Sequence, residues 1–162
     1  MCEKEKMSLT EILTEIIKYD ESFNIANTVR SIEDAISSGK TILDVPMIMI
    51  PLQLLKDEER NEMKTLYGWW GIVDNEELLE SLAADGLKEP LGVIGPMDDG
   101  RYLVLDGKRR RNAIRWMGDQ FWTTPNADTQ KRIPCILLGD KNAPKVVRDI
   151  ISMMENIAYI NR

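Results

Sequence analysis

The sequence predicts an α+β domain, residues 41–162, preceded by a helical extension, residues 1–40. Two observations support this prediction. Several segments place apolar residues three and four positions apart, which is typical of amphipathic helices. Between them lie short runs rich in β-branched residues, bounded by Gly, Pro and Asp, which are typical of strands and turns. A chain of this length suits one domain with its own hydrophobic core.

Two short helices are expected in the extension. Ser8 and Glu11 have the spacing of a capping box. The apolar face of this first helix consists of Leu9, Ile12, Leu13, Ile16 and Ile17. A second segment, which ends at Gly39, has an apolar face of Val29, Ile32, Ala35 and Ile36. We expect the extension to pack on its own domain; the alternatives are self-association and contact with a protein partner.

The domain itself is expected to open with an edge strand. Residues 42–55 are apolar and rich in β-branched side chains, but Pro46 and Pro51 interrupt them. Proline lacks the N–H that a central strand needs, so this pattern favours the edge of a sheet. Further on, the adjacent Trp69 and Trp70 form either a hydrophobic plug or a surface for a partner or ligand.

The next segment contains strong start and stop signals. Asp74 is expected to cap a helix that ends at Gly86. The apolar face of this helix consists of Leu78, Leu79, Leu82 and Ala83. Two strands follow, over residues 91–94 and 101–105, and the turn Asp98-Asp99-Gly100 joins them.

The C-terminal third is expected to contain two helices and one strand. An Arg-rich helix over residues 108–117 ends at Gly118, with Ala113, Ile114 and Met117 facing inward. A long loop, 119–131, leads to a strand over 133–138. The last helix begins near Pro144, and its apolar face consists of Val147, Ile150, Ile151, Met154, Ile157 and Ala158.

Composition excludes several kinds of chemistry. The sequence contains no histidine, so a Ser-His-Asp triad, a Cys-His pair and histidine metal ligands are ruled out. Its two cysteines are expected to be reduced, with Cys135 buried in an apolar run. No apolar run approaches the length of a membrane helix. These features predict a cytoplasmic protein with no membrane partner.

Charge distribution points to a compact anionic ligand. The net charge is −6 and the pI about 4.8, which disfavours nonspecific DNA binding. Basic residues are nevertheless concentrated in one stretch: Arg101, Lys108, Arg109, Arg110, Arg111 and Arg115. DNA remains a less favoured partner through such a local patch.

The start of the Arg-rich helix is a candidate anion site. Cations are unfavourable at a helix N-terminus, where the backbone amides carry partial positive charge. A bound phosphate would reverse this effect, and Gly107 would let the backbone approach it. In the alternative, Arg111 and Arg115 face solvent and the other cations pair with Asp98, Asp99 or Asp106.

A second candidate lies near the end of the last helix. Glu155 and Asn156 place a carboxylate next to an amide between apolar residues. Such a pair could complete the coordination of magnesium on a nucleotide. On spacing alone, a solvent-facing pair at a fraying helix end is the preferred interpretation.

Three segments, in order, resemble the N-terminal domain of ParB proteins, of the ParB/sulfiredoxin superfamily. Residues 77–90 are similar to its E-L-x-x-S-I-x-x-x-G-x-x-Q-P segment. Residues 101–113 resemble the segment that contains the G-E-R-R-x-x-A box, and residues 154–159 resemble the E-N-x-x-R box. The similarity covers roughly residues 44–162.

The resemblance implies a small mixed sheet with packed helices that binds CTP with magnesium and hydrolyses it slowly. By position, it assigns the phosphates to Gly107, Arg109 and Arg110, and we count Lys108, which lies between them, with the same phosphate site. It assigns the metal to Glu155 and Asn156, with Glu155 as the candidate catalytic group. It places the nucleotide base in the vicinity of Gly86, Glu89 and Pro90.

Three positions depart from the ParB pattern. Lys108 stands where the first box has glutamate, Tyr159 where the last has arginine, and Glu89 where glutamine is usual. Hydrolysis and the preference for CTP over another nucleotide therefore stay open. The sequence also ends where ParB proteins continue into a helix-turn-helix, so we expect no recognition of a partition site.

The leading hypothesis is a stand-alone ParB-like domain that binds a nucleoside triphosphate as a molecular switch or weak NTPase. A DNA-interacting or nuclease-like protein is the second hypothesis, and a small-molecule phosphotransferase is the third. Salt-dependent DNA binding would support the second. Phosphate transfer to a hydroxyl acceptor would support the third.

Overall fold

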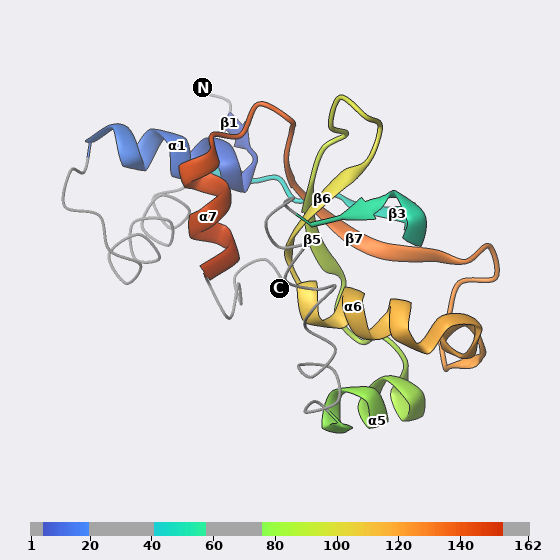
Figure 1. The fold of residues 1–162 in the computed structure, drawn as a ribbon. Coiled ribbons are helices and arrows are strands. Elements are labelled where there is room, and N and C mark those ends of the chain that lie inside the picture. Colours follow the sequence, from blue (N-terminus) through green and yellow to red (C-terminus); the bar gives the residue numbers. More distant parts are fainter. Residues whose placement is uncertain (1–4, 20–40, 58–75, 154–162) are drawn as a thin grey trace.

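The computed structural model describes residues 5–19, 41–57 and 76–153 of the chain (Figure 1). Its main sheet is five-stranded, with the order β3-β7-β5-β6-β4. These strands are β3 (Met47–Pro51), β4 (Leu55–Lys56), β5 (Leu91–Ile94), β6 (Tyr102–Asp106) and β7 (Arg132–Gly139). Pairs β3·β7 and β5·β6 are antiparallel, whereas β5·β7 and β4·β6 are parallel. The predicted α+β class and small mixed sheet are confirmed.

Helices cover both faces of this sheet (Figure 1). The α-helices of the described residues are α1 (Leu9–Tyr19), α5 (Glu76–Asp85), α6 (Lys108–Met117) and α7 (Lys145–Met153). Helices α1 and α7 share one apolar core with side chains of β5, β6 and β7, including Leu105 and Leu138. Helices α5 and α6 share a second core with the opposite side chains of the same strands, including Val93 and Val104. Alternation along the strands thus supplies both cores.

The first predicted helix is confirmed, including its cap. The Ser8 hydroxyl accepts from the Glu11 N–H at 3.2 Å and donates to the Glu11 carboxylate at 3.1 Å. Of the predicted apolar face, Leu9, Ile12 and Leu13 are buried in the first core. Helix α1 therefore packs on the sheet. The second predicted helix of the extension and the Trp69-Trp70 pair lie outside the described residues.

The edge-strand prediction is confirmed for β3, which covers only part of the predicted segment 42–55. Strand β3 is at one end of the strand order and pairs only with β7 among the described strands. A small parallel pair, β1 (Glu5–Met7) with β2 (Thr41–Leu43), was not predicted. Three-residue strands of this kind carry too little periodicity to stand out in a sequence.

Two other details differ from the expectations. Ala83 is exposed, because α5 turns only Leu82 fully inward and keeps Leu78 and Leu79 half-buried. The expected loop 119–131 is partly helical, since η2 (Gly118–Thr123) continues from α6 as a 3₁₀-helix. None of the helices in the described ranges is long and apolar enough to cross a membrane.

Candidate functional site

The candidate site lies where strand β6 and helix α6 meet, at Gly107. Gly107 has φ +90° and ψ +25° and is the N-cap residue of α6, where no side chain caps the helix. A Cβ atom at this position would lie 2.6 Å from Leu91 Cδ2 and 2.9 Å from Arg110 Nη2. Both the left-handed conformation and the close packing require glycine, which adds a structural reason to the approach of an anion expected from the sequence.

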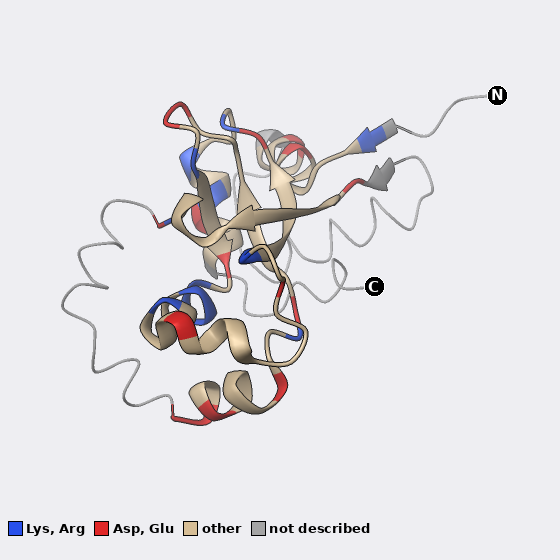
Figure 2. Cartoon of the chain, turned by 90° about the vertical axis from the view of Figure 1, so that its right-hand side faces the viewer, with Lys and Arg blue, Asp and Glu red and all other residues tan. Residues whose placement is uncertain are grey.

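The first turn of α6 has an unusual charge pattern. It contains no acidic residue, and it begins with Lys108, Arg109 and Arg110. Lys108 and Arg110 are half-buried, whereas Arg109 is exposed. Figure 2 shows this basic stretch of α6 above the acidic residues of α5. Because the helix dipole disfavours cations here, the junction is electrostatically suited to an anion.

Arg110 links the junction to the turn that precedes β5. Its Nη1 donates to the Glu89 carbonyl oxygen at 2.8 Å and lies 3.9 Å from the Glu89 carboxylate. Its Nη2 lies 3.9 Å from the Asp106 carboxylate. The structure therefore brings two groups of predicted site residues together, those of the β6–α6 junction and those of the turn near Glu89 and Pro90.

Asp106 is a partly buried carboxylate beside this arginine. Burial raises the pKa of Asp106 above the ordinary value of 3.8, and the nearby Glu89 raises it further. The Arg110 guanidinium and the Gly107 backbone N–H act in the opposite direction. Ionisation of Asp106 is therefore less favourable than ionisation of an exposed aspartate.

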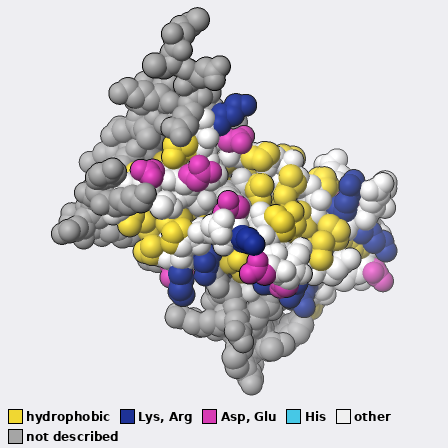
Figure 3. All heavy atoms as spheres, turned by 90° about the horizontal axis from the view of Figure 1, so that it is seen from above, with side chains coloured by type: hydrophobic (Ala, Val, Ile, Leu, Met, Phe, Trp, Pro, Cys, Tyr) yellow, Lys and Arg dark blue, Asp and Glu magenta, His cyan; other side chains and the backbone are white. Residues whose placement is uncertain are grey.

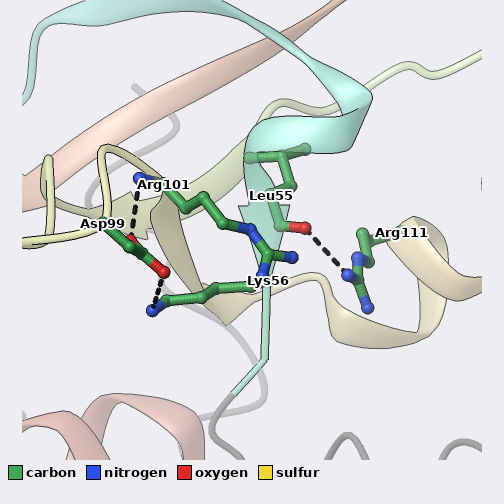
Figure 4. A network of polar contacts seen from close by, with 5 residues as sticks. All are labelled: Leu55, Lys56, Asp99, Arg101 and Arg111. Carbon is green, nitrogen blue, oxygen red and sulfur yellow. Dashed lines mark hydrogen bonds and ion pairs between the residues drawn. The ribbon is translucent and has the colours of Figure 1, made fainter.

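The predicted alternative for the basic residues is wrong for Arg111. Its side chain is 1% exposed and donates to the Leu55 carbonyl oxygen at 2.8 Å (Figure 4). It also forms an ion pair with the buried Asp57, at 3.4 Å. Arg111 therefore anchors α6 to β4 and does not face solvent. Arg115, one turn on, is exposed as that alternative expected.

The acidic residues of the β5–β6 turn also have other partners. Asp99 accepts from Lys56 Nζ at 2.7 Å, and Asp98 accepts from Lys141 Nζ at 2.9 Å. These hydrogen bonds differ from the alternative in which Asp98 and Asp99 pair with the cations of α6. Asp106, by contrast, lies 3.9 Å from the Arg110 guanidinium of α6.

The remaining predicted site residues are not all placed at the junction. Gly86 is buried with φ +74°, and a Cβ there would collide with the Pro125 carbonyl oxygen. Glycine is therefore required at position 86 by the left-handed conformation that ends α5 and by close packing against the loop after η2. Glu155 and Asn156 lie outside the described residues. Within the described residues, no group of three or more acidic, Cys or His side chains could hold a metal.

Sequence reasoning missed Asp57 and the role of Arg101. Arg101 lies just before β6, and its Nε is buried without a hydrogen-bond partner in the described part of the chain. Asp57 and Arg111 are 54 positions apart, so neither periodicity nor a motif connects them. The available signal was the run of consecutive cations itself. Neighbouring helix positions point about 100° apart, so Arg110 and Arg111 could not both lie on the same face of the helix.

Comparison with known proteins gives a likeness to solved structures only. No family model matches the chain, and no curated protein matches it. Among solved structures, the chain is similar to the C-terminally truncated chromosome-partitioning protein ParB from Caulobacter crescentus complexed with CTP-gamma-S. The identity is 21%, the TM-score 0.45, and the match covers 69% of this chain and 53% of that chain. The chain thus spans about half the length of that protein chain, and its function is argued from its own residues.

Proposed function

We propose that the β6–α6 junction binds the phosphates of a nucleoside triphosphate, with CTP and magnesium as the first candidates. The observation that carries this proposal is a helix start with no side-chain cap, no acidic residue in its first turn and four consecutive cations, of which Arg111 is turned to a buried partner. Backbone amides at such a start favour phosphate oxygens. Arginine adds forked donors to the same oxygens, so amides and side chains would act together.

The contacts of Arg110 support a role in positioning. Its hydrogen bond to the Glu89 carbonyl fixes the guanidinium between the helix start and the turn that contains Pro90. A nucleotide with its phosphates on the junction would extend its base toward this turn. Arg109 is exposed, and its guanidinium is therefore the more accessible cation for the terminal phosphates.

Magnesium would use few protein ligands in such a complex. The ion commonly takes one or two carboxylates and phosphate oxygens, and keeps several waters. Near the junction, the carboxylates of Asp106 and Glu89 each already pair with the Arg110 guanidinium, at 3.9 Å. Metal binding is therefore proposed for Glu155 and Asn156, with the bound metal neutralising phosphate charge.

We further propose that nucleotide binding makes this chain a molecular switch, with weak hydrolysis at most. Lys108 supports weak hydrolysis, because it replaces the acidic residue of the G-E-R-R box and leaves the first turn of α6 without a carboxylate. A carboxylate is a common means of orienting an attacking water or accepting its proton. Steady-state release of phosphate from CTP, compared between wild type and Glu155→Gln, measures this activity.

Calorimetry of the full chain tests the proposal. CTP, ATP, GTP and UTP are titrated with and without magnesium into wild type, Arg109→Ala and the control Lys145→Ala. Lys145 is exposed on α7, where it pairs with the nearby Asp149 at 2.8 Å. We expect saturable binding of one nucleotide, weakened at least about tenfold by Arg109→Ala, because a charge-assisted hydrogen bond contributes about 1.5–3 kcal/mol. Absence of binding by all four nucleotides would overturn the proposal.

A further inference from the structure

A second basic site lies on a different face of helix α6. A cavity of about 440 Å³ opens between η1 (Leu52–Leu54), the start of β4, α6 and η2. We call it the cationic pocket; its principal lining residues are Leu55, Arg101, Arg111, Arg115, Trp122 and Lys131. The residues of the β6–α6 junction are not among those that line it. A volume of this size is in the range of small-molecule sites.

The charge of the cationic pocket contrasts with that of the whole protein. Its described lining contains four cationic side chains and no acidic one, in a chain with net charge −6. Asp57, which pairs with Arg111, is buried behind the lining. Asp99 is occupied by Lys56 and by the Arg101 backbone N–H, and the hydrogen bond from Lys56 is the main cause of its lowered pKa. Like charges in one cavity favour an anionic ligand.

Arg101 contributes an unsatisfied donor to this pocket. Its side chain extends from the start of β6 toward Leu55 and Lys56, and the Arg111 guanidinium lies on the other side of the Leu55 carbonyl (Figure 4). The Nε of Arg101 is buried and has no hydrogen-bond partner among the described residues. A buried donor without a partner is unfavourable, and an oxyanion in the pocket would satisfy it.

One wall of the pocket is aromatic. Trp122 is half-buried, and its ring meets Phe121 edge to face, with ring centroids 4.9 Å apart and planes at 76°. Phe121 is 3% exposed in the second core, so it holds the tryptophan in position. Leu52 and Leu55 complete an apolar part of the lining. A planar base can stack on such a surface, as in proteins that bind single strands.

From these observations we infer that the cationic pocket binds a nucleotide unit, with its phosphate on Arg101, Arg115 and Lys131 and its base against Trp122. The unit is either a free mononucleotide or part of a single-stranded nucleic acid. This site is independent of the proposed triphosphate site, because Arg110 and Arg111 point to different faces of α6.

Two probes distinguish the sources. AMP is titrated by calorimetry, and fluorescein-labelled oligo-dT is titrated by anisotropy at two salt concentrations. Each is measured with wild type, Lys131→Ala, Lys131→Arg, Trp122→Leu, Arg109→Ala and the control Lys145→Ala, after circular dichroism has shown that each variant is folded. Lys131 and Lys145 are both exposed, so their substitution is expected to leave the fold intact.

We expect at least one probe to bind, about tenfold more weakly to Lys131→Ala and Trp122→Leu, with recovery in Lys131→Arg and no change in Arg109→Ala or Lys145→Ala. Much tighter, strongly salt-dependent binding of oligo-dT identifies a nucleic-acid strand as the source, whereas binding of AMP alone identifies a free nucleotide. Failure of both probes to bind overturns the inference. Weakening by Arg109→Ala alone does so too, because it assigns the binding to the β6–α6 junction.

Discussion

The substitution Gly107→Ala tests the geometry of the junction most sharply. Gly107 has φ +90°, a conformation that costs a residue with a Cβ about 1–2 kcal/mol. The added methyl group would also lie 2.6 Å from Leu91 Cδ2, and overpacking of a core costs about 1–3 kcal/mol. Together these effects should lower the free energy of unfolding by about 2–5 kcal/mol.

Gly100→Ala is a matched control for this change. Gly100 has a similar φ, +78°, but a Cβ there meets no atom within 4 Å. It should therefore lose only the conformational part, about 1–2 kcal/mol. Urea unfolding followed by circular dichroism gives both values. Equal losses in the two variants would refute the close approach of Leu91 and Arg110 to the Gly107 backbone.

Three further predictions concern buried polar groups. Arg111→Ala leaves the Asp57 carboxylate buried without this guanidinium and should lower the free energy of unfolding by about 3–5 kcal/mol. The double variant with Asp57→Ala should lose less stability than the sum of the two single losses. Additive losses would contradict the ion pair. Burial raises the pKa of Asp106, so the native state loses stability as the pH rises from about 4 through that raised pKa. Asp106→Asn removes this loss and should gain stability relative to wild type between acidic and neutral pH; a constant difference across urea melts at several pH values would contradict it. Burial also raises the pKa of the Cys135 thiol to about 12, so in a Cys2→Ser background it should react with a disulfide reagent only after unfolding; rapid reaction of the native protein would contradict its burial.

Much of the fold could be predicted because its signals are local. Helix α6 begins and ends at the predicted residues, since Gly107 and Gly118 punctuate a clear apolar periodicity. Strand β5 also has its predicted bounds. Conversely, Ala83 is exposed because a small side chain at the margin of an apolar face contributes little to the choice of buried face.

The candidate site could be predicted only in part. Gly107 and the cations that follow it form a local pattern, and the structure adds the hydrogen bond from Arg110 to Glu89. The burial of Arg111 depends on Asp57 and on a two-residue strand that pairs with β6. Such contacts arise from long-range packing, which periodicity within one segment does not encode.

Surface properties also emerge only from the assembled fold. Figure 3 shows hydrophobic side chains among charged ones on the face seen from above, and Met47 and Met49 on the edge strand are 64% and 38% exposed. The cationic pocket likewise draws residues from η1, β4, α6 and η2. Arg101 and Lys131 are 30 positions apart in the chain, so their convergence is a property of the sheet and its connections.

Backbone NMR of the full chain tests the central claim most directly. ¹H–¹⁵N spectra are recorded while CTP and magnesium are added to wild type and to Arg109→Ala. If the junction holds the triphosphate, the amide signals of Gly107, Lys108 and Arg109 should show the largest saturable shifts in wild type, and these shifts should be strongly reduced in the variant. Unchanged junction signals at saturating nucleotide, or shifts confined to residues around the cationic pocket, would contradict the proposed phosphate site.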